Sequence, residues 1–82
     1  MILVTKHRYM GSTRSVKELK DFALKLGIKK AMNLYVPKSQ AARNGLTVAH
    51  YDLESTTRRD QALQQGAALV TNAELNKACK SR

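Results

Sequence analysis

The sequence predicts an α/β fold, with a small sheet of three to four mainly parallel strands flanked by about three helices. Short apolar runs alternate along the chain with segments whose apolar residues recur every three or four positions. Capping hydroxyl residues and glycines mark most of the boundaries between these segments. Strands that alternate with helices usually pair in parallel through right-handed crossovers, so this order predicts a parallel sheet.

We expect a single domain over residues 1–82, because a chain of this length folds around one thin core. The predicted elements follow one another as strand 2–5, turn 11–14, helix 15–27, strand 33–36, loop or helical turn 38–45, strand 46–49, helix 55–66, strand 67–71 and helix 71–80.

The first helix is the best-defined element. Ser15 and Glu18 fit a capping box, in which the hydroxyl and the carboxylate each satisfy a backbone N–H at the helix start. Gly27 is a natural stop. The apolar stripe between them consists of Val16, Leu19, Phe22, Ala23 and Leu26.

The two later helices carry similar signals. Ser55 or Thr57 is expected to cap the second helix, and Gly66 to end it. Thr71 and Glu74 form a second capping box, which opens the final helix.

Composition excludes several classes of protein. Cys79 is the only cysteine, so no internal disulfide forms and the paired-cysteine pattern of a zinc site is absent. We expect Cys79 to be a small apolar residue on the last helix, and we predict no metal and no cofactor. The N-terminal apolar run is too short for a signal peptide or a membrane span, which predicts a soluble, cytoplasmic protein that does not contact a membrane. Two identical chains would bury more apolar area as a homodimer.

The net charge of +9 is placed unevenly. Residues 1–45 hold ten Lys or Arg and two acids, whereas residues 46–82 hold five Lys or Arg and four acids. This asymmetry predicts a nucleic acid, another polyanion or an acidic protein as the partner of the first half. No sequence-reading motif is present, so contacts would be to the backbone of a nucleic acid. The predicted contact residues are Lys17, Lys20, Lys25, Lys29, Lys30, Lys38 and Arg43.

Residues 50–52 are the main candidate for chemistry. Alternation in a strand places His50 and Asp52 on one side and Tyr51 on the other, where it would join the core. A histidine beside an aspartate would serve as a base with an orienting carboxylate, or as two metal ligands. The structural alternative is that Asp52 accepts backbone N–H groups at the helix start while His50 bonds a nearby carbonyl.

Arg58 and Arg59 follow the capping residues of the second helix. A helix start with hydroxyl groups and guanidinium groups suits a phosphate. Alternatively, these arginines pair with neighbouring acids, which are Asp52, Glu54 and Asp60.

His7 extends the same candidate site. A parallel sheet would bring His7, His50 and residues 71–72 to one carboxyl edge. Two histidines with Asp52 would then resemble a facial metal triad, although a thin domain offers little supporting structure around it.

The chain resembles a family of short bacterial and phage proteins of unknown function. The residues that carry this resemblance are Glu18-Leu19 through Leu26-Gly27-Ile28, His50-Tyr51-Asp52-Leu53, Arg59, Ala62, Gly66-Ala67, Val70-Thr71 and Glu74-Leu75. Members of that family usually begin with a strand that ends in acids, whereas this chain has Val4-Thr5-Lys6-His7, and its segment before His50 is longer. The resemblance implies a phage or prophage origin and action inside a bacterial host cell, and it brings no known activity.

Three functions follow from these observations. The first is a non-enzymatic protein that binds nucleic acid or another polyanion, with Arg58 and Arg59 as a second phosphate contact. The second is a phage-encoded protein that binds and modulates a host protein through its basic face. The third is a small nucleotide- or phosphoester-processing enzyme that uses His50 and Asp52, with His7. The absence of a complete catalytic motif favours the two functions without catalysis.

Overall fold

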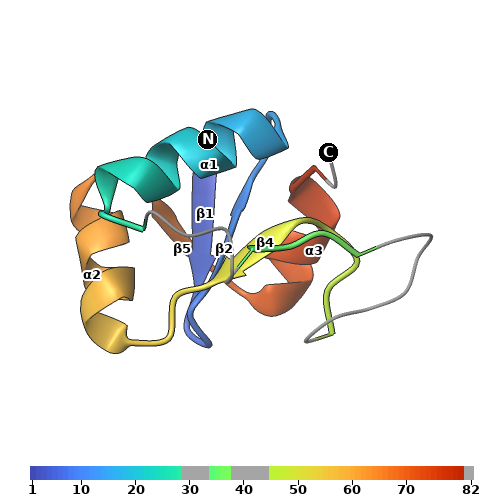
Figure 1. The fold of residues 1–82 in the computed structure, drawn as a ribbon. Helices are drawn as coiled ribbons and strands as arrows, with labels where there is room; N and C mark the ends of the chain where they lie inside the picture. Colours follow the sequence, from blue (N-terminus) through green and yellow to red (C-terminus); the bar gives the residue numbers. More distant parts are fainter. Residues whose placement is uncertain (29–33, 38–44, 81–82) are drawn as a thin grey trace.

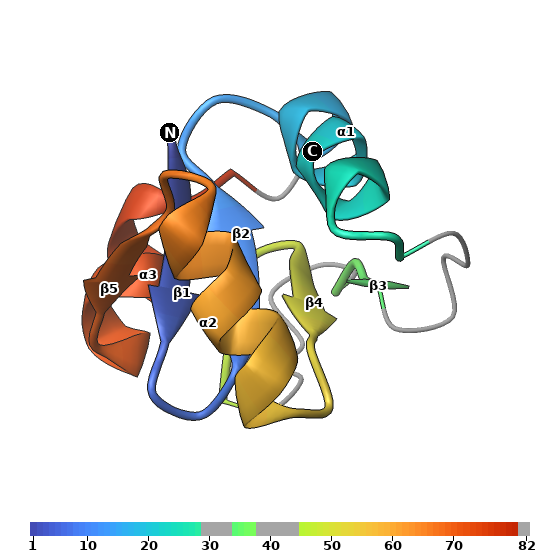
Figure 2. The ribbon, with the colours of Figure 1, turned by 90° about the vertical axis from the view of Figure 1, so that its left-hand side faces the viewer.

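The computed structural model describes residues 1–28, 34–37 and 45–80, and it shows an α/β fold of three helices and a five-stranded sheet (Figure 1). Along the chain the elements are β1 (Ile2–Thr5), β2 (Tyr9–Ser12), α1 (Val16–Lys25), β3 (Leu34–Tyr35), β4 (His50–Asp52), α2 (Thr56–Gln64), β5 (Ala68–Val70) and α3 (Asn72–Ala78). The strands lie in the order β3-β4-β2-β1-β5, which runs from right to left in Figure 2. In that view α2 lies in front of the sheet and α3 behind it, so both faces carry helices.

The sheet is mixed and mostly antiparallel, and the expectation of three to four mainly parallel strands is wrong. β1 and β5 pair in parallel, with Thr5 opposite Val70. The other three pairings, β1 with β2, β2 with β4 and β3 with β4, are antiparallel. The reason is that β2 follows β1 directly as a hairpin, at the point along the chain where a crossover helix was expected. In the sheet, β2 lies between β1 and β4.

The chain reverses at Lys6–Arg8, earlier than the predicted turn at residues 11–14. Arg8 adopts the left-handed conformation, with φ 71°, and its N–H donates to the Thr5 carbonyl at 2.9 Å. The buried hydroxyl of Thr5 accepts the N–H of Tyr9 at 3.2 Å. These local bonds close the hairpin, so the first two residues of the predicted turn lie inside β2.

The strand predicted at residues 46–49 is displaced to His50–Asp52, which form β4. Leu46 and Val48 pack instead beneath α3, in a cluster with Leu75. The strand predicted at 33–36 is found as β3, although Asn33 and residues 38–44 lie outside the described residues.

The predicted helix boundaries follow local chemistry closely. Ser15 and Ser55 accept N–H groups at the starts of α1 and α2, and the capping box of Thr71 with Glu74 is complete. Gly27 and Gly66 have φ of 84° and 106°, as C′ residues that end a helix require.

Each glycine is followed by the paired hydrogen bonds of a Schellman motif. After α1, the N–H of Gly27 donates to Leu24 and that of Ile28 to Ala23, at 3.0 and 2.9 Å. The N–H groups of Gly66 and Ala67 make the equivalent bonds after α2. Backbone N–H groups therefore bond carbonyl groups in the last turns of α1 and α2.

Two apolar clusters hold the layers together, one on each face of the sheet. The cluster under α1 and α2 contains Ile2, Val4, Met10, Leu19, Phe22, Ala23, Leu26, Tyr51, Leu53, Ala62 and Ala67. The cluster under α3 contains Leu3, Leu46, Val48, Leu75 and Cys79. Tyr51 is a core residue, as predicted, and burial raises the pKa of its phenol. Among the described helices, none is long and apolar enough to cross a membrane.

The close approach of α3 to β2 depends on Gly11. A Cβ added at Gly11 would lie 2.8 Å from the sulfur of Cys79 and 3.2 Å from its Cβ. We expect Gly11→Ala to lower the free energy of unfolding by about 1–3 kcal/mol, because the added methyl group overpacks this contact.

Urea denaturation of Gly11→Ala, Cys79→Ala and the double variant tests this expectation. Removing the sulfur makes room for the methyl group, so the double variant should lose less stability than the sum of the two single losses. Strict additivity would show that the two residues do not compete for the same space.

Candidate functional site

His50 is the first residue of β4 and is fully buried, so it lies at the opposite end of that strand from the predicted carboxyl edge. Its Nδ1 lies 2.8 Å from the Val48 carbonyl. Because a carbonyl only accepts hydrogen bonds, Nδ1 carries the proton in this contact. The imidazole also lies against two phenol rings, with centroid distances of 5.6 Å to both Tyr9 and Tyr35. Its surroundings are those of a packed core residue.

Asp52 has a different role at the other end of the strand. Its Oδ1 accepts the N–H of Glu54 at 3.0 Å, and Glu54 adopts φ 62°. The neighbouring N–H of Leu53 donates to the Arg8 carbonyl at 2.9 Å. Asp52 therefore shapes the turn from β4 into α2, and the contacts of both members of the candidate pair correspond to the structural alternative.

Arg58 and Arg59 direct their guanidinium groups to other parts of the protein. Arg58 Nη1 donates to the carbonyl of Leu26, at the end of α1. Arg59 donates to the Lys6 carbonyl at 3.3 Å and pairs with Asp60 at 3.3 Å. Both side chains thus tie α2 to other segments at the place where a phosphate contact was predicted.

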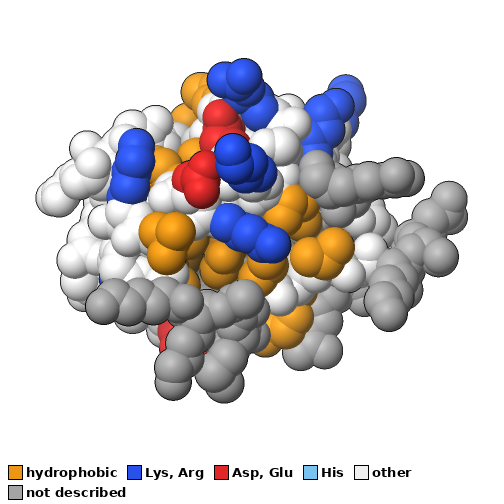
Figure 3. All heavy atoms as spheres, turned by 45° about the horizontal axis from the view of Figure 1, so that its top comes forward, with side chains coloured by type: hydrophobic (Ala, Val, Ile, Leu, Met, Phe, Trp, Pro, Cys, Tyr) orange, Lys and Arg blue, Asp and Glu red, His pale blue; other side chains and the backbone are white. Residues whose placement is uncertain are grey.

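The predicted basic set divides into two groups. Lys17, Lys20 and Lys25 lie on α1 and are exposed. Figure 3 shows this face of the molecule, with Lys and Arg side chains projecting over α1 and acidic side chains between them. The other members lie outside the described residues, and they are Lys29, Lys30, Lys38 and Arg43.

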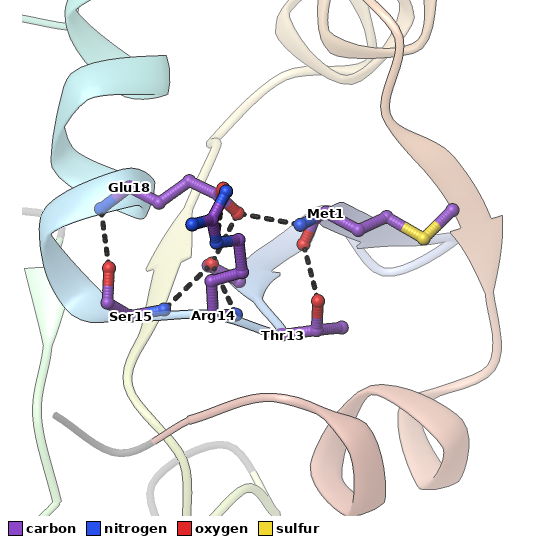
Figure 4. A network of polar contacts seen from close by, with 6 residues as sticks. Met1, Thr13, Arg14, Ser15 and Glu18 are labelled. Atoms are coloured by element: carbon purple, nitrogen blue, oxygen red, sulfur yellow. Dashed lines mark hydrogen bonds and ion pairs between the residues drawn. The ribbon is translucent and has the colours of Figure 1, made fainter.

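Glu18 is the centre of a polar network at the start of α1 (Figure 4). Its Oε1 accepts hydrogen bonds from the N-terminal ammonium of Met1 at 2.8 Å and from the Ser12 hydroxyl at 2.7 Å. The Ser12 oxygen in turn accepts the N–H groups of Arg14 and Ser15 at 3.0 and 3.2 Å. The N–H of Ser15 is therefore bonded to Ser12, so only the Ser15 half of the predicted capping box forms.

This network lowers the pKa of Glu18. The ammonium of Met1 has the largest effect and the Ser12 hydroxyl the next, because both donate to the ionised carboxylate.

His7 lies at the carboxyl ends of β1 and β5, where a hollow of about 440 Å³ opens. As predicted, it shares this edge with Thr71 and Asn72, whereas His50 does not reach it. The hollow also contains residues that sequence reasoning missed, namely Lys6, Leu69, Val70 and Glu74. Within residues 1–28, 34–37 and 45–80, no three His, Cys, Asp or Glu side chains converge as metal ligands would.

Arg58→Ala should lower the free energy of unfolding by about 1–2 kcal/mol, because it removes the charged donor to the Leu26 carbonyl and the packing of the arginine stem. Urea denaturation measures this loss. Arg14→Ala is a matched control, because Arg14 is 78% exposed and reaches Glu18 only at 3.9 Å, so its loss should stay below about 0.5 kcal/mol. Equal losses in the two variants would contradict the bridging role of Arg58.

Glu18 should make the fold sensitive to acid. A carboxyl whose pKa is lower in the folded chain than in the unfolded chain adds stability above its unfolded value of 4.5, and that stability disappears as the pH falls through the folded value. Glu18→Gln should therefore unfold more easily than the parent at about pH 7, and the difference should shrink at about pH 3. Urea denaturation at both pH values measures this. The control is Glu54→Gln, which removes an acid outside the Glu18 network. If the difference in unfolding free energy between Glu18→Gln and the parent did not change with pH, the stabilising role of the ionised Glu18 would be contradicted.

Comparison with known proteins identifies the family of the chain. The sequence profile of DUF4031, described as a protein of unknown function, matches residues 4–82. No curated protein matches the chain. No solved structure matches it either. Because the profile spans nearly the whole chain, from the second half of β1 to beyond α3, the protein belongs to the DUF4031 family.

Proposed function

We propose that this protein binds nucleic acid through the exposed basic surface of α1, without carrying out a reaction on it. We define the α1 surface as Arg14, Lys17, Lys20 and Lys25. All four side chains are exposed, while the opposite side of the helix is buried in the core. This division into a buried apolar face and an outward cationic face is the observation that carries the proposal.

The acids near the α1 surface reduce its charge only in part. Glu18 is held by the N-terminal ammonium and by Ser12, so the network satisfies its charge internally. Asp21 is the other acid on α1 and is exposed. Four cations against one such carboxylate leave a positive potential over the helix, which attracts a polyanion.

The dimensions of the α1 surface suit a nucleic-acid backbone. Lys17 and Lys25 are separated by a rise of about 12 Å along the helix axis. A duplex of that length carries about seven phosphate charges, so several of the cations would meet phosphates at once. In the sequence, Lys29 and Lys30 come shortly after the end of α1 and add to the cationic character of this half.

The geometry gives less support to the enzymatic alternative. His50 is buried against two tyrosines, and Asp52 closes a backbone turn. The remaining alternative is that an acidic protein of a bacterial host binds the same α1 surface. This alternative rests on the phage origin that the family resemblance implies.

The proposal predicts binding of a short DNA duplex that weakens steeply with salt. The test is Lys17→Gln/Lys20→Gln, measured by fluorescence anisotropy across a salt series. If both lysines meet phosphates, the slope of log K against log salt should become shallower by about 1.8. The matched control is Lys6→Gln/Lys77→Gln, which has the same net charge but changes positions away from α1, and it should keep the parent slope.

Two outcomes would contradict the proposal. Equal weakening in both double variants would mean that net charge, and not the α1 surface, determines binding. Absence of binding at low salt would remove nucleic acid as the partner and leave an acidic protein as the candidate.

A further inference from the structure

β5 forms one edge of the sheet, and its outer side is open to a further strand. In the order β3-β4-β2-β1-β5, β5 pairs with β1 alone among the described strands, and it lies at the left of the sheet in Figure 2. The backbone remains extended at Thr71, with φ −77° and ψ 163°. The N–H and C=O groups along the outer side of such an edge strand form a template on which another strand can pair.

The devices that usually protect an edge strand are absent from β5. Natural sheets commonly block a free edge with charged side chains, with proline or with a bulge. Residues 61–73, which include β5, contain no Lys, Arg, Asp, Glu, His or Pro. This is the longest run without a charged residue in a chain that carries 15 Lys or Arg and 6 Asp or Glu. The pairing of β5 with β1 is regular from Ala68 to Val70, so no bulge interrupts the edge.

Leu69 lies at the centre of this edge and is 59% exposed. It is paired with Val4, a member of the cluster under α1 and α2, so its side chain points to that face of the sheet. Ala68 and Val70 point to the other face and pack against the cluster under α3. A strand that paired with β5 would place a side chain opposite Leu69 and cover it.

The charges around this edge favour a second copy of the chain as the partner. Lys6 and Glu74, which line the hollow beside β5, carry opposite charges, and Arg59 is paired with Asp60. The edge therefore attracts neither a strongly acidic nor a strongly basic segment. An uncharged, apolar strand suits it, and β5 itself has this composition. Since two chains with a net charge of +9 repel each other, their contact is favoured where the sequence is uncharged.

We propose that β5 pairs antiparallel with β5 of a second copy, so that one sheet continues through both chains. Two identical antiparallel strands in one sheet are related by a twofold axis perpendicular to that sheet, and twofold symmetry is the commonest symmetry of homodimers. This axis keeps every side chain on its own face, so the strands can shift only by an even number of residues. Centring the pair on Leu69 pairs the most residues, because Leu69 then faces its own counterpart and Ala68 faces Val70 of the second copy.

The proposed dimer also determines where the α1 surfaces lie. α1 and α2 cover the same face of the sheet, so the perpendicular axis would place the α1 surfaces of both copies on one side of the joined sheet. The pairing of β5 does not depend on nucleic-acid binding, since it uses a different part of the molecule.

The short length of β5 limits the strength of the contact. Three residues from each chain provide few backbone hydrogen bonds. They also bury much less than the area of about 800 Å² per partner that is typical of a stable interface. We therefore expect a weak dimer, with a dissociation constant on the order of 100 μM.

Sedimentation equilibrium of the nuclease-treated full chain measures this constant. Leu69→Lys should raise it at least about tenfold, because two like charges would lie directly opposite each other. The fold should persist, since Leu69 is already exposed, and circular dichroism checks this. The matched control is Leu24→Lys, which makes the same change at a residue of α1 that is 58% exposed, and it should keep the dissociation constant of the parent.

Cysteine cross-linking tests which residues face each other. In a Cys79→Ala background, Leu69→Cys would place two thiols opposite each other, with Cα atoms about 4.5–5.5 Å apart, which is within the range of a disulfide. Oxidised glutathione should therefore convert this variant into a covalent dimer. Leu24→Cys in the same background is the control, and it should remain largely monomeric under the same conditions.

Three outcomes would overturn the proposal. They are a monomeric parent protein at about 1 mM, which is ten times the expected dissociation constant, equal weakening by Leu69→Lys and Leu24→Lys, and equal cross-linking of the two cysteine variants. Salt separates this proposal from nucleic-acid binding. Duplex binding should weaken as salt rises, whereas dimerisation should strengthen, because salt screens the repulsion between the two cationic chains. Failure of either proposal would therefore leave the other to be judged by its own measurement.

Discussion

The reversal at Lys6–Arg8 sets β2 antiparallel to β1 and, through the pairings of β4 with β2 and with β3, it also sets the directions of β4 and β3. It sends β2 back along β1, closed by the left-handed conformation of Arg8 and the hydroxyl of Thr5. β4 then pairs antiparallel with β2, so β1, β4 and β5 all end at the same edge of the sheet. The ends of these three strands and the start of α2 therefore lie close to the short turn between β1 and β2.

In this arrangement some charged residues bond to other segments of the chain, whereas others are exposed on the surface. Arg58 and Arg59 are adjacent in sequence, but one reaches the end of α1 and the other the turn after β1. Glu18 similarly joins α1 to Met1, which precedes β1, and to Ser12, the last residue of β2. Such residues add polar bonds between segments that also meet in the apolar core of a thin domain. The lysines of α1 have no comparable position in the fold, and they remain at the surface where a partner can meet them.

Local signals predicted the helices better than the sheet. Caps and stops such as Ser55 and Gly66 depend on bonds within a few residues, so the sequence alone indicates them. Strand pairing depends on distant contacts. Gly11-Ser12 has the composition of a turn, yet it lies in a strand because Gly11 leaves space for Cys79 from the last helix. Residues 46–49 are apolar enough for a strand, but α3 covers them instead.

The candidate site was predicted in part for the same reason. Alternation correctly separated Tyr51 from His50, and the carboxyl edge correctly joined His7 to residues 71–72. The burial of His50 follows from packing against Tyr9 and Tyr35, which belong to other strands and carry no signal near residue 50. Similarly, the hollow requires Leu69 and Lys6 to be neighbours, and only the parallel pairing of β1 with β5 makes them so.

The position of Cys79 gives the protein a chemical property of its own. Burial raises the pKa of this thiol to about 11, so near neutral pH the sulfur remains protonated and is a poor nucleophile. It lies against Gly11 and is only 7% exposed, so a reagent reaches it poorly while α3 packs against β2. The rate of thiol alkylation is therefore a measure of how often the last helix opens, reported by a single atom that the native fold keeps unreactive.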